Sequence, residues 1–205
     1  SPMVRFALGF FAMIGALVFL GCPWRAYLRL AGGDWNAIAG IAGLIAGIGI
    51  GVWFLYGGFS LGAARPTPKA AGLVMPLLAL AILALLFFKP LFGPEGSGPI
   101  FFSAKGPGAA HAPILISVGA GLVVGWLAQR TRFCTIGAVR DLIMVRDSHL
   151  FKGIAAFILA AFVTNMILGQ FKPGFEGQPV AHTMQLWNFL GMVLSGLAFT
   201  LAGGC

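Results

Sequence analysis

Residues 35–64 read WNAIAGIAGLIAGIGIGVWFLYGGFSLGAA and contain no Lys, Arg, Asp or Glu. A helix needs about 20 apolar residues to cross the hydrocarbon core of a bilayer, so this stretch is long enough for one crossing. Four further runs also lack charged side chains: Ala70 to Phe88, Gly106 to Gln129, Gly153 to Phe171 and Gly177 to Cys205. The pattern predicts a chain that crosses a membrane several times.

The composition of the whole chain excludes a soluble domain. Hydrophobic residues make up 59% of the 205 residues and charged residues only 9%, whereas about 25% of the residues in an ordinary soluble domain are charged. The net charge of +8 does not indicate a nucleic-acid partner, because the basic residues lie between the apolar runs and form no single stripe. They are typical of charges that flank membrane helices.

Run length and periodicity predict an all-α polytopic membrane protein with about six spanning helices. Their expected ranges are 3–21, 35–59, 69–88, 112–129, 150–170 and 185–203. Two connections, residues 21–34 and 130–141, are too apolar for plain loops and too short to span. Such segments are typical of re-entrant helices, which enter a membrane without crossing it.

The basic residues also predict an orientation. One side of the expected topology holds eight of the thirteen Lys and Arg residues, and the positive-inside rule makes that side the cytoplasm. We therefore expect a multi-pass protein of a bacterial-type cytoplasmic (inner) membrane. The eight residues are Arg5, Arg65, Lys69, Arg130, Arg132, Arg140, Arg146 and Lys152.

A weak internal repeat relates the first and last expected helices. Leu20-Gly21-Cys22 follows the first helix as Gly203-Gly204-Cys205 follows the last, and these two helices run in opposite directions in the expected topology. Inverted repeats of this kind are common in secondary transporters. We expect one membrane domain, residues 1–205, with the end of a first repeat in 1–68 and most of a second in 69–205.

The three cysteines all lie at predicted helix breaks, beside glycine or near arginine. A single cysteine is usually a small apolar packing residue, and an arginine near a helix end often reaches toward lipid headgroups. A thiol at a broken helix can instead line a water-filled cavity, where cations and helix N-termini attract anions. The candidate substrate pathway comprises Cys22, Cys134, Cys205, Gly21, Gly203, Gly204, Arg25 and Arg132.

Other chemistry has little support in the sequence. The histidines, His111, His149 and His182, fall in predicted loops without the shared spacing of a metal site, so we assign them to the surface. We find no nucleophile–base pair, phosphate-binding loop or Cys/His cluster. We therefore expect no enzyme activity, no cofactor and no metal. The glycines that recur through the second helix indicate close helix packing.

The cysteine segments resemble a known family. Residues 125–141, GWLAQRTRFCTIGAVRD, and 201–205, LAGGC, resemble the two hallmark motifs of the YeeE/YedE sulfur-transport family. Residues 19–25, FLGCPWR, resemble the branch of YedE-related selenium-metabolism membrane proteins. The family order implies that the chain is an internal fragment, with a Phe-Cys motif before residue 1 and a continuation beyond Cys205.

The resemblance implies two inverted repeats around an hourglass-like interior, in which cysteines pass thiosulfate along by S–H hydrogen bonds. Cys22, Cys134 and Cys205 would then lie near the constriction. The Gly-Cys-Pro-Trp-Arg sequence at 21–25 stands where a Gly-Gly-Cys motif is expected. This departure leaves a selenium compound open beside thiosulfate.

Three functions remain open at this point. The first is a channel-like permease for a small sulfur- or selenium-containing solute. The second is a thiol-redox or sulfur-transfer protein in which a cysteine carries a persulfide or perselenide to a cytoplasmic sulfur- or selenium-carrier protein. The third is a structural bundle with incidental thiols. We favour them in this order, with the lipid bilayer as a partner in each.

Overall fold

The structure is a computed structural model that describes residues 2–62, 69–88 and 112–203. The described chain is helical, as predicted. Its elements are α1 (Pro2–Phe19), α2 (Pro23–Ala31), α3 (Asn36–Tyr56), α4 (Lys69–Phe88), α5 (Ile114–Thr131), α6 (Thr135–Met144), α7 (His149–Ile167) and α8 (Gln185–Ala202).

Six of these helices match the six expected spans, with no end displaced by more than three residues. The two short helices, α2 and α6, occupy the segments for which re-entrant helices were predicted. Five helical stretches of the described chain are long and apolar enough to cross a bilayer, and Ala70–Leu85 of α4 forms a shorter apolar helix. The chain is therefore a multi-pass membrane protein.

The chain divides into two compact units. The larger unit contains Ser1–Gly62 and Trp126–Cys205, and the smaller contains Ala63–Gly125. Helix α4 and most of α5 belong to the smaller unit, whereas the last six residues of α5 belong to the larger. The predicted division into inverted repeats at residue 69 remains a prediction.

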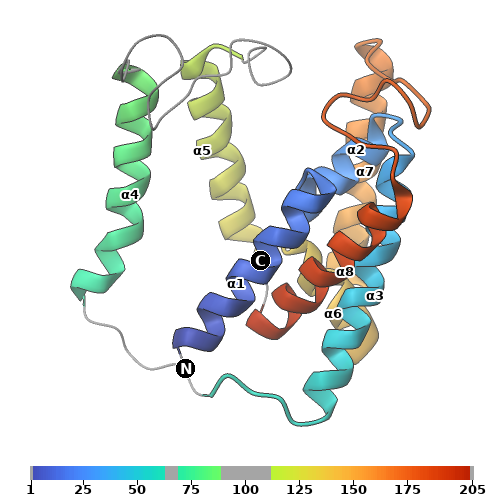
Figure 1. Ribbon diagram of the computed structural model, residues 1–205. Helices are drawn as coiled ribbons and strands as arrows, with labels where there is room; N and C mark the ends of the chain where they lie inside the picture. Colours follow the sequence, from blue (N-terminus) through green and yellow to red (C-terminus); the bar gives the residue numbers. More distant parts are fainter. Residues whose placement is uncertain (1, 63–68, 89–111, 204–205) are drawn as a thin grey trace. The chain divides into compact units, whose positions relative to one another are not determined.

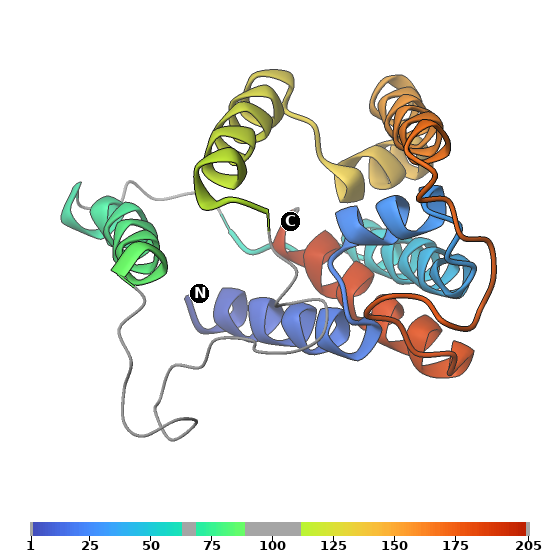
Figure 2. The same ribbon diagram turned by 90° about the horizontal axis from the view of Figure 1, so that it is seen from above.

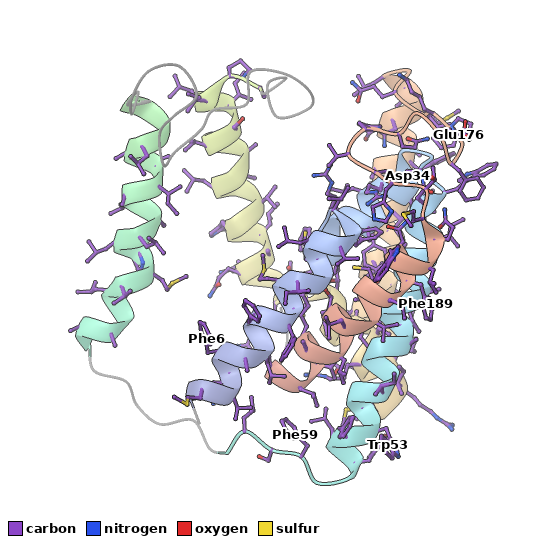
Figure 3. All side chains as sticks on the ribbon, in the orientation of Figure 1. Phe6, Asp34, Trp53, Phe59, Glu176 and Phe189 are labelled. Carbon is purple, nitrogen blue, oxygen red and sulfur yellow. The ribbon has the colours of Figure 1, made fainter. Side chains whose placement is uncertain are left out.

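Within the larger unit, α3 packs against α8 on one side and against the short helices α2 and α6 on the other. Helix α8 lies between α1 and α3, and α7 packs against both short helices (Figures 1 and 2). Asp34 and Glu176 lie at one end of this unit, and Trp53 and Phe59 at the other (Figure 3). We call these the Asp34 end and the Trp53 end.

Small residues bring α3 and α8 into close contact. Gly43, Gly47 and Gly51 recur every four residues and lie on one face of α3. A Cβ atom at Gly47 would lie 2.9 Å from the backbone nitrogen of Leu197, so the backbones of the two helices almost touch there. This arrangement confirms that these glycines serve helix packing, which in membranes relies on close backbone approach.

The outer surface of the larger unit is apolar. Phe6 is 77% exposed and Ile167 is 78% exposed, and Trp53 and Leu186 are also largely exposed. Soluble proteins rarely expose large apolar side chains in such numbers. The buried core is correspondingly small and centres on Phe19, Leu44, Ile48, Ile136 and Met192.

Candidate functional site

Cys22 and Cys134 each precede a short helix. Cys22 is the N-cap of α2 and Cys134 the N-cap of α6, and both have extended backbone conformations. Pro23 follows Cys22 at the first position of α2, where its missing N–H costs no helical hydrogen bond. Two of the three predicted pathway thiols, Cys22 and Cys134, therefore lie at helix N-termini, whose exposed N–H groups favour anions.

The turn before each cysteine has the same form. Leu20 and Arg132, each two residues before a cysteine, adopt left-handed backbone with φ of 59° and 52°. The next residue donates its N–H to a carbonyl five residues back, a pattern that ends helices tightly. These bonds run from Gly21 to Ala16 at 2.9 Å and from Phe133 to Ala128 at 3.2 Å.

Gly203, two residues before Cys205, is also left-handed, with φ of 100°. Leu20 and Gly203, the first residues of the two similar triplets Leu20-Gly21-Cys22 and Gly203-Gly204-Cys205, therefore share a left-handed backbone conformation. Gly204 and Cys205 themselves lie outside the described residues. Their place in the substrate pathway remains a prediction.

The two short helices point away from each other along α3. The last residue of α2 precedes α3 by a short turn, so α2 leads to the Asp34 end (Figure 1). At the other end, the Tyr56 hydroxyl in the last residue of α3 donates to the carbonyl of Met144, the last residue of α6, at 3.3 Å. The N-termini of α2 and α6 therefore lie between the two ends of α3.

Helix lengths place this meeting point near the middle. At 1.5 Å per residue, the 9 residues of α2 and the 10 of α6 are about 14 and 15 Å long, and the 21 residues of α3 about 32 Å. The summed length of α2 and α6 is thus close to the length of α3, and the length of α3 is close to the thickness of a hydrocarbon core, about 30 Å. Discontinuous half-helices of this kind form the substrate sites of many secondary transporters, where their N-termini point at anionic groups.

An aromatic cluster joins the two cysteine segments. The Trp24 ring contacts the Phe133 ring edge-on, with centroids 5.3 Å apart, and the Phe157 ring of α7 at 5.5 Å. Trp24 lies two residues after Cys22 and Phe133 directly precedes Cys134. This pairing could not be predicted from the sequence, because the two rings are more than a hundred residues apart along the chain.

The two thiols differ in their surroundings. Cys22 is exposed and its side chain makes no capping hydrogen bond. Cys134 is half-buried, and its Sγ accepts a hydrogen bond from the backbone N–H of Gly137 at 3.3 Å. The next side chain, Thr135, is fully buried, and its hydroxyl has no hydrogen-bond partner in the part of the chain that the structure describes.

The two predicted pathway arginines are both exposed, and Arg25 lies against Gly21, another predicted pathway residue. Its side chain covers Gly21, so that a Cβ atom there would lie 2.9 Å from Cδ of Arg25. Arg132 occupies the left-handed position that ends α5. The structure thus brings Gly21, Cys22 and Arg25 together at the start of α2.

Arg29 does not extend toward headgroups, contrary to the ordinary interpretation of such arginines. The residue is buried, with an exposed fraction of 8%, and its Nε donates to Oδ2 of Asp34 at 2.6 Å. Its Nη1 donates to the carbonyl of Phe19 at 2.9 Å. Sequence reasoning missed this pair because Asp34 adjoins an apolar helix and no local pattern indicates burial.

His182 corrects a second expectation. It was assigned to the surface, but it is half-buried and its Nε2 donates to the carbonyl of Val18, in the last turn of α1, at 2.7 Å. His149 is exposed as predicted, and His111 lies outside the described residues. The loop before α8 therefore satisfies one of the carbonyls that the end of α1 leaves without a helical partner.

Comparison with known proteins finds partial similarity to thiosulfate transporters. A thiosulfate transporter, TsuA, of Spirochaeta thermophila is 35% identical over 89 residues, which cover 42% of this chain and 26% of that protein. The TsuA of Escherichia coli K12 is 29% identical over 93 residues, 45% of this chain and 26% of that protein.

The chain thus matches about a quarter of the length of each of these two relatives, and neither supports the selenium branch suggested by residues 19–25. No family model matches the chain. No solved structure matches it either. The chain is a membrane protein distantly related to thiosulfate transporters.

Proposed function

We propose that this chain forms part of a membrane passage for a small sulfur oxyanion of the thiosulfate kind, with Cys22 and Cys134 on its wall. The observation that carries this proposal is the meeting of two helix N-termini, each capped by a cysteine, midway along α3. The distant relationship to thiosulfate transporters supports the choice of solute.

The electrostatics of this arrangement suit an anion. Each helix N-terminus carries about half a positive charge and several N–H groups without helical partners. Two such ends that face one another would stabilise a negative charge at a depth where lipid alone disfavours it. A fixed cation would hold the anion more tightly, whereas a conducting site must also release it.

The thiol suits this compromise, because S–H is a weak hydrogen-bond donor. A solute oxygen or sulfur could exchange one S–H contact for the next without a deep energy minimum. Cys22 is exposed and so available for such contact, and Cys205 would extend the path as the resemblance implies. Arg25, beside Gly21, would attract the anion to the start of α2.

The positive-inside rule indicates the direction in which the solute would move. Arg140, Arg146 and Lys152 lie on α6, on the following turn and at the start of α7, toward the Trp53 end. That end would face the cytoplasm of a bacterial-type cell and the Asp34 end the outside. Solute would therefore enter beside α2 and leave beside α6.

Uptake of labelled thiosulfate by cells that carry the intact protein tests the proposal. Cys22→Ala and Cys134→Ala should each reduce uptake at least about tenfold, since each removes a contact on the path. Uptake at the wild-type rate in both variants would refute the passage. Leu17→Ala, which changes an exposed side chain of α1, is the matched control and should transport normally.

Serine variants separate hydrogen bonding from covalent transfer. A hydroxyl can still donate a hydrogen bond, so Cys22→Ser and Cys134→Ser should retain part of the uptake if the thiols only contact the solute. A carrier of persulfide or perselenide would lose all activity in the serine variants. It would also show an added sulfur or selenium on one of the cysteines by mass spectrometry. Parallel uptake of selenite tests the selenium alternative.

A further inference from the structure

A cavity of about 920 Å³ lies at the Asp34 end of the larger unit, between α2, the end of α7 and the loop that follows α7. Its lining includes Arg25, Arg29, Asp34, Asn165, Lys172 and Gln178. Of these, only Arg25 belongs to the predicted substrate pathway. Most of the cavity wall is therefore formed by residues outside the predicted substrate pathway.

The cavity wall carries three basic side chains and one carboxylate. The carboxylate of Asp34 is already engaged, because Oδ2 accepts from Nε of Arg29 and Oδ1 accepts from the backbone and side-chain N–H groups of Asn36 at 2.9 Å each. Arg25 and Lys172 are exposed and form no ion pair within the described ranges. The lining is thus left with two uncompensated positive charges.

Arg29 is a rigidly held residue of the wall. Its guanidinium carbon lies 4.3 Å from the centre of the Phe19 ring, and two of its nitrogens are bonded to Asp34 and to the Phe19 carbonyl. Its Nη2 is buried and has no partner among the described residues. The charge of Arg29 is compensated by Asp34, so this residue holds the wall in place.

The loop that carries Lys172 is held in place. The side-chain Nε2 of Gln178 donates to the carbonyl of Lys172 at 2.7 Å and to that of Gly174 at 3.2 Å. The backbone N–H of Lys172 donates to the carbonyl of Gly32, which follows α2, at 3.0 Å. The backbone of Lys172 is therefore fixed against the end of α2.

We propose that this cavity binds a small free oxyanion with a tetrahedral centre, such as thiosulfate or sulfate, between Arg25 and Lys172. The volume exceeds that of such an ion, so the ion would retain part of its hydration. Because Arg25 also covers Gly21, next to Cys22, the cavity adjoins the start of the proposed passage. Its role as an entry site rests on the proposed function, whereas the binding itself does not.

Equilibrium binding of thiosulfate and of sulfate to the intact protein, purified in phosphatidylcholine nanodiscs, tests the site. Arg25→Gln and Lys172→Gln should each weaken thiosulfate binding about tenfold, the effect of losing one charge-assisted hydrogen bond. Lys152→Gln makes the same change of charge on an exposed residue outside the cavity and should bind like the wild type. Unchanged binding in both cavity variants would overturn the proposal.

A second set of binding measurements uses nanodiscs that contain phosphatidylglycerol. The phosphate of this lipid carries negatively charged oxygens on a tetrahedral centre, as thiosulfate and sulfate do. If the affinity for thiosulfate is unchanged in the presence of this lipid, the result supports a site for a free anion. Loss of that affinity, with phosphatidylglycerol retained by the wild type and not by Arg25→Gln or Lys172→Gln, would assign the cavity to a lipid headgroup and refute the proposal. Weakened binding in the cavity variants together with normal uptake in both Cys22→Ala and Cys134→Ala would keep the site and remove the proposed passage.

Discussion

The ring of Trp24 lies edge-on against the ring of Phe133, with centroids 5.3 Å apart and ring planes at 87°. This contact joins the first turn of α2 to the residue before Cys134. It therefore fixes the relative position of the two cysteine segments, and both rings also meet Phe157 of α7. An edge-on pair of this kind stabilises a structure beyond the area that it buries.

Trp24→Ala should destabilise the larger unit by about 2–4 kcal/mol, as large-to-small changes at packed aromatic sites do. Trp24→Phe retains a ring and should cost less. Trp187→Ala is the matched control, because Trp187 is 50% exposed on α8. Thermal unfolding in detergent measures all three. Equal losses for Trp24→Ala and Trp187→Ala would contradict the role given to the cluster.

Gly47 and Gly49 provide a paired test of the packing between α3 and α8. A Cβ atom at Gly47 would contact the carbonyl oxygen of Val193, whereas one at Gly49 meets nothing within 4 Å. Gly47→Ala should therefore destabilise the unit by about 1–3 kcal/mol through overpacking. Gly49→Ala should be neutral or gain up to about 1 kcal/mol, since alanine favours helix. A larger loss at Gly49 than at Gly47 would show that the helices pack on another face.

Leu20 tests the tight turn before Cys22. Leucine at φ of 59° is strained, and glycine is the residue that this position of a helix end usually holds. Leu20→Gly should raise the unfolding free energy by about 1 kcal/mol. Leu17→Gly, inside α1 and also exposed, should lower it by about 1 kcal/mol. If chemical denaturation gives the same loss for both variants, Leu20 is not left-handed.

The sequence was sufficient to predict the helices, because each span is a long, largely uncharged apolar run and each break carries Gly, Pro or Arg. It also led us to the short helices at 21–34 and 130–141, whose apolar character is unusual for loops. The partners across the fold were not predictable. Trp24 with Phe133, and His182 with Val18, are separated by more than a hundred residues, and no local pattern encodes such contacts.

The chemistry of the site was predictable only in part. Cysteines beside helix breaks indicated Cys22 and Cys134, and the structure adds that each is the N-cap of a short helix. The cavity near Lys172 was not foreseen, because Lys172 follows α7 and meets Arg25 and Arg29 only through the fold. The burial of Arg29 likewise depends on Asp34 and on the carbonyl of Phe19.

The most direct measurement is the reaction of single cysteines with a small charged methanethiosulfonate in proteoliposomes, in variants that keep only Cys22 or only Cys134. Leu17→Cys, on the exposed face of α1, is the control for a thiol in lipid. We predict that Cys22 and Cys134 react with the charged reagent and that Leu17→Cys reacts only with an apolar maleimide. If Cys22 and Cys134 also react only with the apolar maleimide, the thiols face acyl chains and no aqueous passage runs between α2 and α6.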